Sequence, residues 1–239
     1  MEFYNVYEDA KRAESYATIE FPGTYYLAYR DLPEIISKHA KRGKAIDLGC
    51  GAGRSTRFLQ KCGFDTVGVD ISEDMIKKAR EIDPNGKYYL IANGDFSQFE
   101  KNHFDLVLSV FTFDNIPNIQ NRIKLLSAVK NLLNEDGRII LLDSTPEIYK
   151  NEWASFTTKD FPENKHAQSG DRVKIIMTDV EDKRPVEDLI WYDEDYRKIF
   201  KKAGLKLIET YKPLAKEDEP YKWVNEMAIA PWVIYVLKR

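Results

Sequence analysis

The chain has 239 residues, of which 43% are hydrophobic and 31% are charged, which is ordinary for one globular domain. The formal net charge of −3 argues against the positive stripe by which nucleic-acid-binding domains attract phosphates. The sequence has no run of about 18 apolar residues and no signal-peptide pattern, so we expect a cytosolic protein that does not enter a membrane. Two cysteines without a Cys/His cluster predict neither a disulfide framework nor a metal site.

The first half of the chain predicts a parallel sheet. Residues 1–43 read as largely helical, with an interruption at Phe21-Pro22-Gly23, and precede the first strand. From residue 44 to residue 143, short apolar runs alternate with helical patterns, and such alternation is typical of a parallel sheet with helices on both faces. The predicted strands are residues 45–48, 66–70, 88–92, 106–110 and 138–143.

The clearest helix lies between the fourth and fifth of these strands. Its apolar residues recur at steps of three and four, and the sequence Asn134-Glu135-Asp136-Gly137 ends the pattern. The apolar positions that define it are Ile119, Ile123, Leu126, Val129 and Leu133.

The chain changes character after residue 143. Polar stretches with prolines surround residues 173–178, which read as an antiparallel strand. A helix with Asp193 as its N-cap and Gly204 as its stop follows, and then strands at 205–211 and 232–237. We therefore expect an N-terminal extension (1–43), a core (44–143), an inserted lid (144–190) and a return to the core (191–239).

A strand, a glycine-rich turn and a helix at residues 45–59 predict a cofactor site. The turn reads Asp47-Leu48-Gly49-Cys50-Gly51-Ala52-Gly53, and glycines there let the backbone approach a ligand closely. A dinucleotide-binding turn has the spacing G-x-G-x-x-G, but position 54 is Arg. The carboxylate of Asp47 would repel a pyrophosphate, yet it can accept from an ammonium group. Asp70, at the end of the second strand, is placed to bind both hydroxyls of a ribose.

These motifs, in this order, resemble those of the class I S-adenosylmethionine-dependent methyltransferases. The resemblance covers about residues 44–143 and, more loosely, the end of the chain. It rests on the glycine turn, on Val67-Gly68-Val69-Asp70-Ile71-Ser72, on Gly94-Asp95-Phe96 and on Phe104-Asp105-Leu106-Val107-Leu108-Ser109. It implies a Rossmann-like α/β fold with seven mostly parallel strands, the last antiparallel, and S-adenosylmethionine as the cofactor.

The resemblance also implies roles for single residues. Gly49, Cys50 and Gly51 would surround the methionine part of the cofactor. Ile71 and Met75 would flank the adenine, the Asp95 carboxylate would accept from its amino group, and the Phe96 N–H would meet a ring nitrogen. Ser109 and Val110 would lie beside the sulfonium. The candidates for reaching the cofactor carboxylate are Tyr16, Tyr25 and Arg30, while Arg54 is either a further one or a solvated side chain.

The methyl acceptor is expected beneath two lid segments, residues 1–43 and 144–190, where aromatic residues gather. A base is needed only where the acceptor arrives protonated, and Asp114 is the candidate. The alternative is that Asp114, with Asn115, caps the helix that begins near Pro117. A small-molecule N- or O-methyltransferase is the favoured interpretation. A nucleic-acid or protein methyltransferase and a non-enzymatic cofactor-binding regulator stay open.

Overall fold

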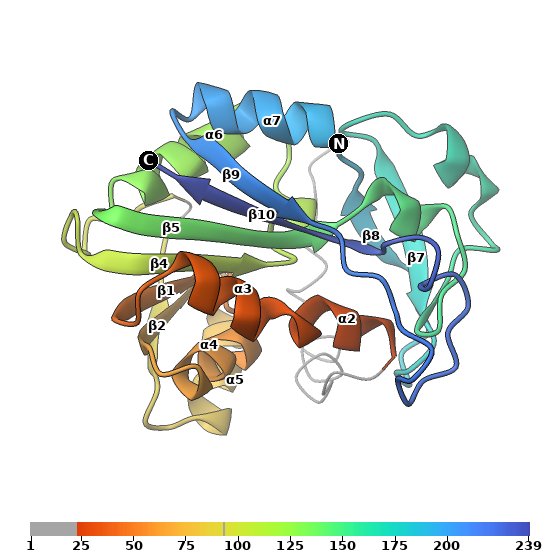
Figure 1. The fold of residues 1–239 in the computed structure, drawn as a ribbon, viewed down its shortest axis with the longest axis horizontal. Coiled ribbons are helices and arrows are strands. Elements are labelled where there is room, and N and C mark those ends of the chain that lie inside the picture. Colours follow the sequence, from red (N-terminus) through yellow and green to blue (C-terminus); the bar gives the residue numbers. More distant parts are fainter. Residues whose placement is uncertain (1–22, 93) are drawn as a thin grey trace.

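A seven-stranded sheet forms the centre of the protein (Figure 1), for which a computed structural model describes residues 23–92 and 94–239. Its strands are β1 (Lys44–Leu48), β2 (Asp65–Asp70), β3 (Lys87–Leu90), β4 (Phe104–Val110), β5 (Leu133–Ser144), β9 (Lys206–Tyr211) and β10 (Trp232–Lys238). They lie in the order β3-β2-β1-β4-β5-β10-β9, and β10 runs antiparallel between β5 and β9. The predicted architecture, with the last strand antiparallel and inserted beside the fifth, is confirmed.

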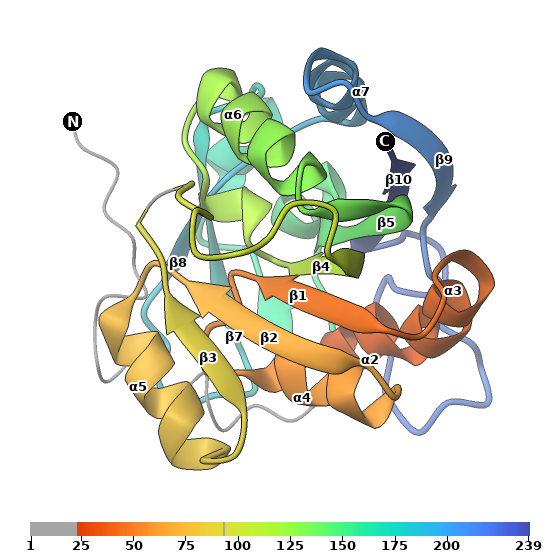
Figure 2. The same ribbon diagram turned by 90° about the vertical axis from the view of Figure 1, so that its left-hand side faces the viewer.

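Helices cover both faces of this sheet, as predicted (Figures 1 and 2). They are α2 (Thr24–Arg30), α3 (Leu32–His39), α4 (Arg54–Lys61), α5 (Glu73–Ile82), α6 (Ile119–Lys130) and α7 (Asp193–Lys202). Helices α6 and α7 pack on one face, and α3 and α4 pack on the other, with α5 beside β3. Within the described residues, each helix is too short or too polar to cross a bilayer. Short 3-10 turns lie at η2 (Phe113–Asn115), η3 (Pro146–Tyr149) and η4 (Pro162–His166).

The central strands read as continuous apolar runs because both of their sides are buried. In β4, Leu106 and Leu108 face the core that α3 and α4 share, whereas Val107 faces the core of α6 and α7. Alternating side chains thus contribute to two separate cores on either side of one strand. This two-sided burial fixes the register of β4, so that its carboxyl end is held firmly at one edge of the sheet.

Helix α6 is shorter than its apolar spacing predicts. The helix ends at Lys130, and Leu133 instead begins β5, where it pairs with Phe104. The side chain of Leu133 still packs into the core that α6 covers. An apolar residue at a helical step can therefore belong to the next strand, because both elements bury it in the same place.

The predicted N-cap of α7 is wrong by one residue, whereas its predicted start at Asp193 and its predicted end are confirmed. Asp193 is the first helical residue and Tyr192 is the N-cap. Asp193 with two further acids fills the first turn, where negative charge is favourable, and it also accepts a hydrogen bond of 2.9 Å from the hydroxyl of Tyr235. Gly204, with φ of 71°, follows the C-cap as a left-handed stop.

A second, three-stranded sheet lies beyond the carboxyl ends of β4 and β5 (Figure 1). Its antiparallel strands are β6 (Phe156–Thr157), β7 (Arg172–Met177) and β8 (Val186–Leu189). The antiparallel strand predicted around residues 173–178 is therefore confirmed. Val173, Ile175 and Met177 alternate along β7 and pack in one core with helix α2.

One buried carboxylate joins three segments that are far apart in the sequence: helix α2, the residues around β6 and the connection 212–231. We call these three segments the roof. Glu226 accepts hydrogen bonds from the Thr24 hydroxyl (2.8 Å) and from the backbone N–H of Ala154 (2.7 Å). It also accepts from the N–H groups of Val224 (2.8 Å) and Asn225 (3.1 Å). These bonds satisfy a fully buried charge and fix the roof above the sheet edge.

We predict that Glu226→Gln lowers the free energy of unfolding by about 2–3 kcal/mol, because an amide NH2 then faces buried N–H donors. Urea unfolding measures this change. Glu217→Gln is the matched control, because Glu217 is exposed in the same connection. Equal stability of the two variants would contradict the role of Glu226.

Candidate functional site

A cavity of about 260 Å³ lies where β1, β2, β4 and β5 end, beneath the roof. The carboxyl edge of such a sheet is the usual binding position in open α/β folds. Two groups of residues form its wall. The loop end consists of Gly49, Cys50, Gly51, Arg54, Asp70, Ile71, Met75 and Gly94. The aromatic chamber consists of Tyr25, Phe111, Asp114, Ser144, Phe156, Met177, Val186, Asp188 and Trp232.

The glycine turn packs closely against the end of β2 and against the loop that follows β4. The backbone N–H groups of Gly49 and Cys50 both donate to the Val69 carbonyl, at 2.9 and 3.0 Å. Gly49 has φ of 72°, and a Cβ there would lie 2.2 Å from the Thr112 hydroxyl oxygen. At Gly51, by contrast, the atom nearest to an added Cβ would be the Met75 sulfur, at 3.9 Å. Gly51 therefore leaves room at the cavity wall for a ligand.

Asp70 ties this turn to the end of β2. One of its oxygens accepts from the Gly51 N–H at 2.8 Å and the other from the Ser72 N–H at 2.9 Å. Burial raises the pKa of the Asp70 carboxyl. Beside it, the apolar side chain of Ile71 is 54% exposed, while Met75 is buried at the start of α5. The structure thus brings the predicted ribose and adenine residues together on one wall, and their contacts to a ligand stay predictions.

Asp47 lies beneath the turn and not on the cavity wall, which corrects the expectation that it faces a ligand ammonium. It is fully buried, and one oxygen accepts from the hydroxyls of Ser55 (2.7 Å) and Thr56 (2.6 Å). Within the described part of the chain, its other oxygen has no hydrogen-bond partner. The side chain therefore anchors the first turn of α4 to β1. Burial raises the pKa of Asp47 to about 6.

Three other predicted cofactor residues turn away from the cavity wall. Asp95 is exposed and accepts from the Ser97 N–H at 2.9 Å, and the Phe96 side chain packs into the core. Ser109 is buried and donates to the Leu48 carbonyl at 3.1 Å, which ties β4 to β1. Val110, next along the chain, does line the cavity. The adenine contacts of Asp95 and of the Phe96 N–H stay predictions.

Arg54 joins the loop end to the aromatic chamber. Its guanidinium lies 5.5 Å from the ring centres of both Tyr25 and Tyr29, a cation–π arrangement. The side chain is half-buried and lines the cavity. Of the two roles considered for Arg54, the structure favours a cation that faces a ligand over a solvated side chain.

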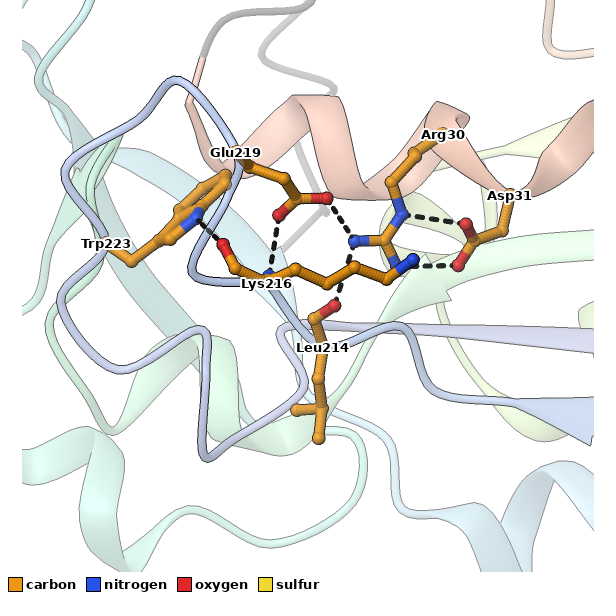
Figure 3. Close-up of polar contacts among 6 residues, drawn as sticks. All are labelled: Arg30, Asp31, Leu214, Lys216, Glu219 and Trp223. Atoms are coloured by element: carbon orange, nitrogen blue, oxygen red, sulfur yellow. Dashed lines mark hydrogen bonds and ion pairs between the residues drawn. The ribbon is translucent and has the colours of Figure 1, made fainter.

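Arg30 does not reach the cavity wall, and its predicted contact with a cofactor carboxylate needs correction. Its guanidinium binds the Asp31 carboxylate at 2.7 and 2.8 Å, and it donates to the Leu214 carbonyl at 2.9 Å (Figure 3). It also forms an ion pair of 2.5 Å with Glu219. Arg30 therefore fastens the connection 212–231 to helix α2. Tyr16, the remaining candidate, lies outside the described residues.

Four aromatic rings pack around the chamber. Tyr25 meets Phe111 at 5.7 Å and Phe156 at 5.1 Å, both edge to face, and stacks on Trp232 at 5.7 Å. Phe111 and Trp232 are 4.7 Å apart between ring centres. Phe111 has φ of 56°, which is unfavourable for an aromatic residue and is characteristic of functional positions.

Asp114 lies on the wall of this chamber and is not a helix cap. Asn118 caps α6, since its side chain accepts from the Asn121 N–H at 2.9 Å. Asp114 instead accepts from the Ser144 N–H at 3.3 Å. Burial raises the pKa of Asp114. Burial also raises the pKa of the neighbouring Asp143, and the charge of Asp114 adds to that effect.

A buried arginine, which sequence reasoning missed, supports this carboxylate pair. Arg122 of α6 is fully buried, donates to the carbonyls of Phe113 and Ile116, and lies 4.1 Å from the centre of the Trp191 ring. Its positive charge lowers the pKa of both Asp114 and Asp143, against the effect of burial. The sequence did carry a signal, because Arg122 lies three residues after Ile119 and four before Leu126, on the apolar stripe.

The family of the chain follows from its match to known proteins. A family model described as a methyltransferase domain matches residues 23–210, from the start of the described chain into β9. The chain belongs to this methyltransferase family. The aligned relatives include an uncharacterized methyltransferase of Alkaliphilus oremlandii, with 27% identity over 50% of this chain and 55% of the relative.

Another relative of this methyltransferase is the ubiquinone/menaquinone biosynthesis C-methyltransferase UbiE of Wigglesworthia glossinidia brevipalpis. It is 30% identical over 45% of this chain and 45% of the relative. The chain thus spans about half the length of these relatives. A crystal structure of an S-adenosylmethionine-dependent methyltransferase from Clostridium acetobutylicum has the same fold, with a TM-score of 0.61 and 16% identity over 98% of this chain and 96% of that one.

The position of Asp47 predicts a pH dependence of stability. Burial raises the pKa of the Asp47 carboxyl to about 6, so its protonated form stabilises the fold fully at pH values below its ordinary pKa near 4. This stabilisation is lost as the pH rises from 4 through 6. Asp47→Asn keeps an acceptor for both hydroxyls without the charge. We expect the variant to gain up to about 3 kcal/mol relative to the wild type between about pH 4 and 7. Urea unfolding of the ligand-free proteins measures this, and parallel pH profiles would contradict it.

Proposed function

We propose that the chain is an S-adenosylmethionine-dependent methyltransferase that methylates a nitrogen or an oxygen of a small molecule. The observation that carries the proposal is one cavity with two distinct walls. The glycine turn and Asp70 form one wall, and an aromatic chamber that contains Asp114 forms the other. A methyltransferase needs these two compartments side by side, because the donor and the acceptor must meet in line.

The residues at the loop end fit the cofactor. Gly51 gives a ligand access to the backbone, and the Arg54 cation stands where a carboxylate could bind, at the start of α4. The exposed face of Ile71 offers an apolar surface for a base, and Asp70 stands where a ribose would lie. Bound S-adenosylmethionine supplies a methyl group that a sulfonium already activates.

The residues of the chamber orient the acceptor, exclude water and take up its proton. The roof lies over the chamber, and the aromatic rings line a partly open, mostly apolar space. Such a space suits a small molecule better than a strand of nucleic acid or a protein segment. In this proposal Asp114 acts as the general base, because burial raises its pKa toward the range in which a carboxylate accepts protons well.

A pool of small amines, alcohols, phenols and carbon acids tests the proposal. Release of S-adenosylhomocysteine with one of them, and location of the new methyl by NMR, would establish the reaction and the acceptor atom. Binding of the cofactor without turnover of any compound in the pool, or of nucleic acid or protein, would favour a non-enzymatic regulator. Turnover only on nucleic acid or protein would favour the other methyltransferase classes, and a C-methylated product would replace nitrogen or oxygen as the acceptor atom.

We predict that Asp70→Asn weakens the binding of S-adenosylhomocysteine by about 10- to 100-fold, because a charge-assisted hydrogen bond to the ribose is lost. Calorimetry measures the affinity. Asp65→Asn is the control, because Asp65 begins the same strand and forms an exposed ion pair with Lys87. Titration with NAD should give no heat in any of these proteins. An affinity that does not change in Asp70→Asn would remove Asp70 from the cofactor site.

We predict that Asp114→Asn lowers kcat by about 100-fold where the acceptor arrives protonated, while cofactor affinity stays as in the wild type and Tm does not fall. Because the base must be ionised and burial raises its pKa, wild-type kcat should rise with pH beyond the ordinary carboxylate range. In the variant, kcat should no longer fall at acidic pH. Near-normal turnover with an unchanged pH profile would leave Asp114 without a catalytic role.

A further inference from the structure

The loop between β4 and α6, residues 111–118, carries Asp114 and is strained at both of its ends. Phe111 begins the loop with φ of 56°, and Asn118 closes it with φ of 55°. Such backbone angles are uncommon for residues other than glycine, and they persist only where surrounding contacts hold the chain. The loop therefore needs support from its neighbours to keep Asp114 on the chamber wall.

This support comes from two sides. On the side of the glycine turn, the Thr112 hydroxyl donates to a carbonyl of β1 at 3.0 Å. On the side of α6, Arg122 donates to the Ile116 carbonyl at 3.0 Å and also to the Phe113 carbonyl. These two carbonyls lie on either side of Asp114 along the chain. The fork of one guanidinium group thus holds the turn that carries the carboxylate.

Arg122 is an unusual residue for its position. It is fully buried on the apolar side of α6. Its guanidinium lies 4.1 Å from the centre of the Trp191 ring and 5.5 Å from that of Tyr196. The rings attract the cation but do not neutralise it. Because a cation is rarely buried completely unless an opposite charge compensates it, we looked for the acids that Arg122 serves.

Those acids are Asp114 and Asp143. The charge of Arg122 lowers the pKa of both carboxyls, against the effect of burial. Two nitrogens of the guanidinium bind the loop carbonyls, and within the described residues the third, Nη1, has no hydrogen-bond partner. Arg122 therefore acts on the two carboxyls through its charge and through the backbone, and not through a direct hydrogen bond.

The other titratable groups around the two carboxyls are neutral or acidic. Tyr196 of α7 donates to the second carboxyl of the pair at 3.4 Å. Tyr149 of η3 is close enough for the charge of Asp114 to raise its pKa, and it donates to Asp188 of β8 at 3.1 Å. Burial raises the pKa of both tyrosines, so they stay protonated where a carboxyl titrates. The positive charge that acts on Asp114 is that of Arg122.

We propose that Arg122 is a positioning residue for methyl transfer, which holds Asp114 on the chamber wall and supplies the positive charge beside which this base ionises. The inference rests on the proposed function, in which Asp114 takes the proton of the acceptor. A base must be ionised before it can accept a proton, and two buried carboxyls disfavour each other's ionisation. Arg122 offsets that effect from outside the chamber, since it does not line the cavity.

Two variants separate the charge of Arg122 from its hydrogen bonds. Arg122→Lys keeps the charge but lacks the fork, and Arg122→Gln is neutral but can still donate to one carbonyl. The titration of Asp114 is followed by 13C NMR of labelled aspartate carboxyls, with its signal assigned by its absence in Asp114→Asn. Hydrogen exchange is followed at the Asn115 and Ile116 N–H groups, which donate within the loop. Both are measured with S-adenosylhomocysteine bound.

We expect Arg122→Gln to raise the midpoint of the Asp114 titration by about one pH unit or more, because the offsetting charge is gone. Arg122→Lys should keep the wild-type midpoint, while the Asn115 and Ile116 N–H groups exchange about tenfold faster, because a carbonyl loses its donor. Lys124→Met removes an exposed cation from the same helix and is the control, in which neither quantity should change.

A purely structural arginine would lower Tm in both variants without moving the midpoint, and that result would overturn the proposal. So would a midpoint that rises equally in both variants, or unchanged exchange in Arg122→Lys. If Arg122→Gln does not fold, Arg122→Lys decides alone: a retained midpoint with faster exchange supports the proposal, and any other combination overturns it. A wild type that does not bind S-adenosylhomocysteine would instead overturn the proposed function, and with it the reaction that Arg122 serves.

Discussion

Parallel strands in one sheet end at the same edge, and this constraint places the loop end of the site and the floor of the chamber. Gly49 follows β1, Asp70 ends β2, Phe111 follows β4 and Ser144 ends β5. The sheet brings these residues to the wall of one cavity although they are distant in the sequence. Burial of β4 and β5 on both faces holds those strand ends in register. The loops can therefore carry polar and strained residues without loss of position.

The roof forms the second compartment of the cavity, above the one formed by the sheet edge. The sheet edge presents backbone and carboxylate groups to a polar cofactor, whereas the roof adds an aromatic compartment. The hydrogen bonds of Glu226 hold its segments together. The ion pair of Arg30 with Glu219 does the same (Figure 3). Both are charged groups that maintain the shape of the chamber from outside it. Inside it, the aromatic walls lower the polarity around each charged group, which strengthens the electrostatic effect of that charge.

The sequence predicted the sheet and the loop end well, because those features depend on local patterns. Strand periodicity and the glycine turn place Gly51 and Asp70 without any knowledge of distant contacts. The chamber was less predictable, since its residues meet only through tertiary packing. Asp188 lies on a four-residue strand whose inward face is fixed by its pairing with β7. Arg30 was misplaced for the same reason, because a partner 189 positions away holds it.

The most direct test of this account is a crystal structure of the protein with S-adenosylhomocysteine. We expect the adenine beside Ile71, the ribose hydroxyls on Asp70 and the amino acid end toward Arg54. The sulfur should point into the aromatic chamber, and the space between Asp114 and Asp188 should stay free for an acceptor. Ligand density within the aromatic chamber, with the glycine turn and Asp70 left untouched, would contradict the division of the cavity on which the account depends.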